Sequence, residues 1–150
     1  MSALAQERLL TFEIGTRLFA VPITSVVEVA QMGQLACIPT LSPDVAGVIN
    51  YRGDALPVVR RERLLQIGDD ALDDPEHVLV ISDRPTHAPR LGLNVDRVLG
   101  LIDAEEAQAR GGDPVAEKRP IDGRVAHILD PTRLVARARE VIESSLGRGE

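Results

Sequence analysis

Residues 47–59, which read GVINYRGDALPVV, decide the fold of this chain. β-Branched and aromatic residues dominate both arms of the stretch, and Arg52-Gly53-Asp54 interrupts them, so the pattern predicts a β-hairpin. Gly53 can adopt a positive φ without the steric penalty of a Cβ, which closes the turn and leaves Arg52 on its rim with its N–H donors directed outward. Pro57 has no N–H to donate, so the second arm is expected at a sheet edge, or to begin near this proline.

The composition limits the classes of function. The 150 residues are enough for one domain or two small subdomains. The apolar part is built from Leu, Val, Ile and Ala, with two Phe, one Tyr and no Trp, which leaves few rings to stack on bases. The net charge is −6, so the attraction to phosphate that drives nucleic-acid binding is missing overall, and docking on anionic lipid is disfavoured. We therefore expect no nucleic-acid partner.

The cysteine count and the hydropathy of the chain indicate whether disulfides can form and where the protein is located. Cys37 is the only cysteine, which excludes an internal disulfide and a thiolate metal cluster; we expect a small core residue there. Residues 1–8 contain no apolar segment of signal-peptide length, and no run approaches a membrane span. The sequence predicts a cytoplasmic protein without direct membrane insertion.

Further strands and turns are indicated in the first half of the chain. Alternating apolar residues predict a hairpin over 9–20 that turns at Gly15-Thr16. Residues 23–30 predict one helical turn passing into a strand with Glu28 exposed. Ser42-Pro43-Asp44 is typical of a helix start, with the helical turn ending at Gly47. Residues 60–67 predict a short helix behind a basic cluster.

The second half begins after an acidic loop, 68–76, which we expect to separate two halves. It predicts a buried strand at 77–82, strands at 91–95 and 98–102, a long mobile loop at 103–120, and a strand returning from an Asp122-Gly123 turn. An amphipathic helix follows Asp130-Pro131, with Leu134, Val135, Ala138 and Ile142 on its apolar stripe. The prediction is a mainly β fold of two small barrels, about 18–68 and 76–131, with the first strand free to pair with either.

Enzyme chemistry has little support in the sequence. His77, His87 and His127 lie in three different segments at no metal-ligand spacing, and the aspartates at 69–74 miss the calcium-loop pattern. Nucleophile, Walker and dinucleotide motifs are all missing. We expect no catalytic residue, no metal and no cofactor.

Several motifs in a fixed order carry a family resemblance. They are LTFEIG (10–15) with LFAVP (18–22), VVEV (26–29), SPDVAGVINYRG (42–53), LGLNVDRVLG (91–100) and DGRVAHILD (122–130). Over about 9–135 the chain resembles the CheW family, the adaptor proteins of bacterial chemosensory arrays, with 136–150 as a helical extension. The VVEV segment matches the family's V-x-E-V element, and 42–53 matches its Pro…G-x-x-N-L-R-G signature.

The resemblance implies a fold of two five-stranded barrels packed on a shared hydrophobic seam. It implies a role as a non-catalytic adaptor that bridges the regulatory domain of a CheA-type histidine kinase to the cytoplasmic tip of membrane-bound chemoreceptors. It also implies site residues. Arg52 stands at the receptor-facing arginine, flanked by Asn50 and Gly53, and Glu28 stands near the receptor groove with Val26 beside it.

The sequence departs from the family pattern in three places. Arg60-Arg61 follows Val59 where the family usually has Asp-Leu, and we count both arginines as candidate receptor- or kinase-binding residues. Asp54 and Ala55 occupy turn positions that are usually apolar. The family's strand before the last hairpin is not evident in 103–120, so the second barrel is expected to be incomplete. These departures leave open a CheW-like protein that binds one partner and modulates or decouples signalling, and, in another class, a small-barrel ligand- or nucleic-acid-binding module.

Overall fold

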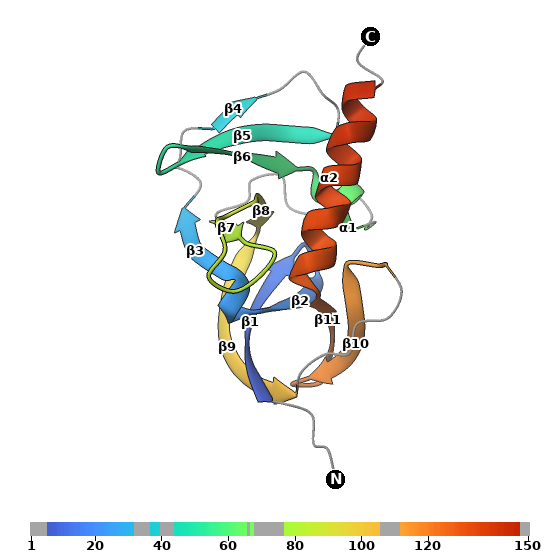
Figure 1. Ribbon diagram of the computed structural model, residues 1–150. Helices are drawn as coiled ribbons and strands as arrows, with labels where there is room; N and C mark the ends of the chain where they lie inside the picture. Colours follow the sequence, from blue (N-terminus) through green and yellow to red (C-terminus); the bar gives the residue numbers. More distant parts are fainter. Residues whose placement is uncertain are drawn as a thin grey trace.

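The computed structural model describes residues 6–31, 37–39, 44–65, 67, 77–105 and 112–147. Two sheets and a long helix organise these residues (Figure 1). The first sheet contains β1 (Gln6–Ile14), β2 (Arg17–Pro22), β9 (Arg97–Glu105), β10 (Val115–Ile121) and β11 (Arg124–Leu129). The second sheet contains β3 (Val26–Gln31), β4 (Cys37–Pro39), β5 (Val45–Tyr51), β6 (Asp54–Val59), β7 (His77–Ile81) and β8 (Leu91–Val95). A 3-10 turn, η1 (Ile23–Ser25), and two helices, α1 (Arg61–Leu65) and α2 (Pro131–Gly147), complete the fold.

The predicted fold class is confirmed: the protein is mainly β, with two strand clusters and a C-terminal amphipathic helix. The strand orders are β10-β11-β2-β1-β9 and β3-β7-β8-β6-β5-β4. The second sheet thus has six strands instead of the expected five, because the short β4 pairs with β5. In the described part of the chain neither strand order returns to its first strand, so the sheets are open and not closed barrels. In the first sheet a side chain spans the open side, where Arg119 Nη1 donates to the carbonyl of Glu105 at 2.8 Å.

The sheets do not coincide with the expected subdomains of about 18–68 and 76–131. The first sheet combines β1 and β2 with the three last strands, and the second sheet is the continuous middle of the chain. The physical reason is that β1 pairs with β9 along nearly its whole length, while β11 lies parallel to β2. The expected boundary loop, 68–76, lies outside the described residues.

Two local predictions need correction. The expected long loop at 103–120 contains strand on both sides, because β9 continues to Glu105 and β10 begins at Val115; residues 106–111 are not described. The strand before the last hairpin is therefore present, and it was missed because its central residues, Glu117 to Arg119, are charged. The expected helical turn ending at Gly47 is replaced by β5, which begins at Val45; Ser42 and Pro43 lie outside the described residues.

The other element predictions are confirmed. The hairpin over 9–20, the helical turn passing into a strand at 26–31, the short helix after Arg60 and the strand at 77–81 all form. The expectation that Pro57 marks a sheet edge or the start of a strand is wrong, because Pro57 lies inside β6, an interior strand between β8 and β5. Among the described residues, β6 pairs with β8 at Val58↔Gly92 alone, and Val58 is the position after the proline. The missing N–H of Pro57 thus falls where this pairing ends.

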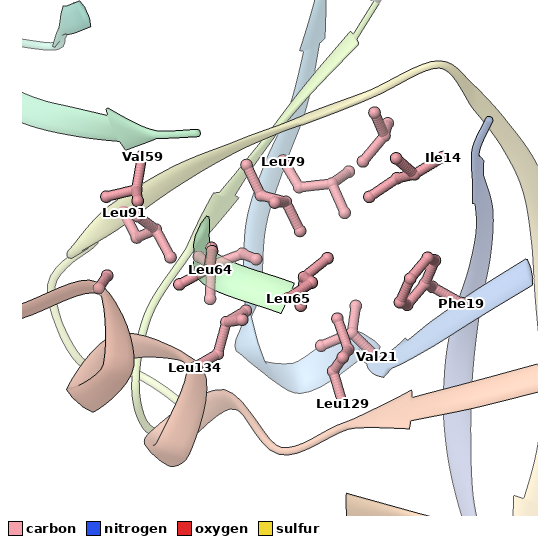
Figure 2. Packing of buried hydrophobic residues seen from close by; sticks show 14 of the residues in the cluster. Ile14, Phe19, Val21, Val59, Leu64, Leu65, Leu79, Leu91, Leu129 and Leu134 are labelled. Atoms are coloured by element: carbon pink, nitrogen blue, oxygen red, sulfur yellow. The ribbon is translucent and has the colours of Figure 1, made fainter. Parts of the chain in front are cut away.

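The two sheets meet at a hydrophobic seam, which we define as the largest buried cluster together with α1 and the inner face of α2 (Figure 2). Both sheets and both helices contribute to it. Its members include Ile14, Phe19, Val21, Val59, Leu64, Leu65, Leu79, Leu91, Leu129 and Leu134. Leu134, Val135, Ala138 and Val141 of α2 are buried, with Ile142 packed partly against the cluster, so the predicted apolar stripe packs into the seam. Burial of each large side chain contributes about 1.5–3 kcal/mol.

A buried ion pair completes the seam. Asp96 lies between β8 and β9, where the chain passes from the second sheet to the first. Its Oδ1 accepts a hydrogen bond from Arg61 Nη1 at 2.8 Å, and its Oδ2 accepts one from the backbone N–H of Gly15. The backbone N–H of Asp96 also donates to the carbonyl of Glu13 at 3.0 Å. Asp96 therefore connects α1, the β1–β2 turn and the crossing between the sheets.

Candidate functional site

The hairpin formed by β5 and β6 ends in a tight turn at Arg52-Gly53, where the sequence predicts one. Arg52 has φ 50° and Gly53 has φ 90°. Positive φ at both central residues is the signature of a type I′ turn, whose twist matches that of the flanking strands. The Asn50 side chain closes this turn, because its Oδ1 accepts a hydrogen bond from the Gly53 N–H at 2.9 Å. Asn50 and Gly53 thus shape the turn that carries Arg52.

Three side chains meet beside this turn, and we call Glu28, Tyr51 and Arg52 the rim cluster. Glu28 comes from β3, and Tyr51 is the last residue of β5. The Tyr51 hydroxyl donates to Glu28 Oε1 at 2.8 Å, and Arg52 Nη2 reaches the same oxygen at 3.3 Å. The guanidinium carbon of Arg52 lies 5.2 Å from the centre of the Tyr51 ring, within the range of a cation–π contact. The rim cluster therefore combines a carboxylate, a phenol and a guanidinium.

Exposure within the rim cluster is graded. Tyr51 is buried among Ile49, Leu56 and Val58 inside the second sheet. The side chains of Glu28 and Arg52 are 39% and 76% exposed. Burial and the hydrogen bond and negative charge of Glu28 raise the pKa of the Tyr51 phenol, while the charge of Arg52 acts in the opposite direction. The phenol therefore stays protonated, and can donate, throughout the neutral pH range.

The predicted site residues fall in three places. Glu28, Asn50, Arg52 and Gly53 lie together at the rim. Val26 does not join them, because it is partly buried against the seam. Arg60 is exposed and lies between the opposite end of β6 and the start of α1, about 20 Å along the strand from the turn.

Arg61 differs from its neighbour. It is buried, and it forms the ion pair with Asp96 in the seam. The adjacent Arg63 likewise pairs with the buried side chain of Asp44, at 3.1 Å. Arg61 and Arg63 of this basic cluster thus pair with buried carboxylates, although the Arg63 side chain is half exposed, and Arg60 is exposed as well. An Arg61→Leu change would remove the ion pair of Asp96, so it is unsuitable as a surface substitution.

Sequence reasoning did not identify Tyr51 as part of the site. Two signals were available: Tyr51 is the only tyrosine of the chain, and a tyrosine on a buried strand next to a turn usually needs a partner for its hydroxyl. The partner itself lies 23 residues away on another strand.

Among the residues that the structure describes, no group of three or more His, Cys, Asp or Glu side chains could hold a metal ion. Within the same residues, no helix is long and apolar enough to cross a membrane.

The fold and the rim define a two-sheet β domain that presents a charged hairpin end. A model of the CheW-like domain matches residues 8–139, and the chain therefore belongs to the CheW-like family, as its motifs indicate. The chemotaxis protein CheW of Thermotoga maritima is 29% identical over 140 residues, covering 89% of this chain and 90% of that protein. The protein FrzA of Myxococcus xanthus is 29% identical over 116 residues, covering 75% and 71%. The crystal structure of the scaffolding protein TtCheW from Thermoanaerobacter tengcongensis has the same fold, with a TM-score of 0.66 at 21% identity over 87% of this chain and 92% of that one.

Proposed function

We propose that this protein is a non-catalytic chemotaxis adaptor that couples chemoreceptors to a CheA-type histidine kinase. It would act in the cytoplasm, at arrays of membrane-bound receptors, and bind the regulatory domain of the kinase and the cytoplasmic tip of the receptors. The family match over 8–139 and relatives named for chemotaxis support this proposal. The observation that carries it is the rim cluster, which is built on the two family motifs V-x-E-V and N-L-R-G.

The rim cluster has the properties of a contact site. Its ion pair is exposed, and such pairs contribute only about 0–1 kcal/mol to folding. A contacted arginine in an interface can contribute about 2 kcal/mol or more to binding. Arg52 and Glu28 also offer both signs of charge next to each other, which favours a partner with complementary charges and fixes its register.

One of the three departures from the family pattern, and half of another, no longer favour the loss of a partner. Arg61 is directed into the seam, so its change from an apolar residue is an internal one. The strand that was expected to be missing is β10. Arg60, Asp54 and Ala55 remain as exposed changes, and these positions keep the one-partner alternative open.

The proposal is tested by measuring affinity for two probes, a chemoreceptor tip fragment and the kinase regulatory domain from the same genome. We expect wild-type protein to bind both. Arg52→Ala should weaken receptor binding about 30-fold, which corresponds to about 2 kcal/mol. The measurement is a titration by calorimetry or biolayer interferometry.

Arg124→Ala is the matched control. Arg124 also lies next to a hairpin turn, and it pairs with Glu13 at 2.7 Å in the first sheet. The Arg124→Ala variant should leave receptor affinity unchanged. Equal losses in the two arginine variants would contradict a specific role for the rim, and binding of the kinase domain alone would favour the one-partner alternative.

A further inference from the structure

Tyr51 has two parts that behave differently. Its ring is buried in the interior of the second sheet, so the position of the hydroxyl is fixed by packing. The hydroxyl itself reaches the half-exposed carboxylate of Glu28. The hydroxyl of Tyr51 thus links a buried ring, which packing holds in place, to the half-exposed carboxylate of Glu28.

Both donors of the rim cluster use the same acceptor atom. The Tyr51 hydroxyl and Arg52 Nη2 both contact Glu28 Oε1, at 2.8 and 3.3 Å. A shared oxygen fixes the carboxylate relative to the guanidinium, and the ring below Arg52 restricts the guanidinium further. Glu28 and Arg52 both have long flexible side chains, and ordering them on binding costs conformational entropy that is avoided when they are held in advance.

We propose that Tyr51 is a positioning residue, which holds Glu28 and Arg52 in the orientation that binds the partner. This inference rests on the proposed function, because it concerns the same binding site. The partner surface that fits is one that presents an acceptor to Arg52 and a donor to Glu28 side by side. Tyr51 acts through its hydroxyl and does not need to touch the partner.

The composition of the chain makes this role measurable. Tyr51 is the only tyrosine and there is no tryptophan, so the ultraviolet titration of phenolate reports on this residue alone. The raised pKa places its titration above the ordinary value of about 10. Glu28→Gln should move the midpoint down towards that value, because it removes the negative charge while retaining an acceptor. An unchanged midpoint would show that the contact is not made in solution.

The binding test uses Tyr51→Phe, which removes the hydroxyl and keeps the ring. Affinity for the receptor tip fragment should fall roughly tenfold, as expected for a hydrogen bond to a charged group. In a Glu28→Ala background the same change should have little further effect, because no side-chain acceptor is left for the Tyr51 hydroxyl to position. A merely structural role would give the same loss in both backgrounds.

Thr11→Val is the matched control for hydroxyl removal. Thr11 is also buried, and its hydroxyl donates to the carbonyl of Gly100 at 3.1 Å in the first sheet. Thr11→Val should lower the free energy of unfolding about as much as Tyr51→Phe does, and it should leave receptor affinity unchanged. If Glu28→Gln weakens binding and Tyr51→Phe does not, the positioning role is overturned while the proposed function stands. If neither Arg52→Ala nor Glu28→Gln weakens binding, the proposed site is overturned and the positioning role with it.

Discussion

Two arginine–carboxylate pairs, one in the seam and one at the rim, show how differently the same chemistry can be used within one chain. The side chains of Arg61 and Asp96 are 7% and 2% exposed, whereas those of Arg52 and Glu28 are 76% and 39% exposed. In the seam, water is excluded, and the loss of either partner leaves a buried charge without compensation. At the rim, water screens both charges, so the pair contributes little to folding and remains available to another molecule. The comparison predicts that stability depends on the seam and binding depends on the rim.

The largest expected effect is that of removing α2 from the seam. Truncation before Asp130 removes the buried side chains of Leu134, Val135, Ala138 and Val141. At about 1.5–3 kcal/mol for each large side chain, this loss is a large part of the 5–15 kcal/mol that stabilises a typical domain. The melting temperature in calorimetry should fall by more than about 10 °C, or cooperative unfolding should disappear.

A truncation after Gly147 is the control for α2, since it shortens the chain without removing any of these contacts. This shortened protein should have the same melting temperature as the full-length protein. If the protein truncated before Asp130 also has the melting temperature of the full-length protein, α2 does not stabilise the seam and is better explained as a partner-binding tail.

The second effect concerns the buried ion pair. Asp96→Ala should destabilise the protein by about 3–5 kcal/mol in urea unfolding, because the buried Arg61 then loses the Asp96 carboxylate and the N–H of Gly15 loses an acceptor. The double variant Arg61→Leu with Asp96→Asn keeps an acceptor for Gly15 and removes both charges. It should be more stable than Asp96→Ala, and a double variant that is equally unstable would argue against an uncompensated charge as the cause.

The sequence could predict local structure, namely turns and helices. The turn at Arg52-Gly53 followed from the glycine and the β-branched arms, and α2 followed from a capping Asp-Pro and an apolar stripe with helical spacing. The strand β10 was missed because it is an edge strand with Glu117, Lys118 and Arg119 at its centre. Charged residues protect an edge from unwanted pairing, and they also remove the apolar alternation by which a strand is recognised.

The contacts of the candidate site could not be predicted, because they depend on how the second sheet curves. β3 and β5 are not neighbours in the strand order, and yet Glu28 meets Tyr51 and Arg52. Arg61 posed the same problem. Beside Arg60 it has the pattern of an exposed basic pair, and its partner Asp96 lies 35 residues further along the chain. The family motifs located Glu28 and Arg52 separately, and only the three-dimensional arrangement joins them through Tyr51.

The smallest expected effect is that of rim substitutions on stability, and it separates the turn from the charge. Arg52 adopts φ 50°, a conformation that costs most residues roughly 1 kcal/mol and that asparagine tolerates well. Arg52→Ala keeps this cost and loses an exposed ion pair, so the free energy of unfolding should fall by about 0.5 kcal/mol or less. Arg52→Asn creates the Asn-Gly pair favoured in type I′ turns, and unfolding in urea should show equal or slightly higher stability than wild type. Both variants lack the guanidinium, and both should therefore lose receptor binding to a similar extent. An Arg52→Asn protein that binds the receptor tip as wild type does would show that the turn, and not its charge, forms the contact.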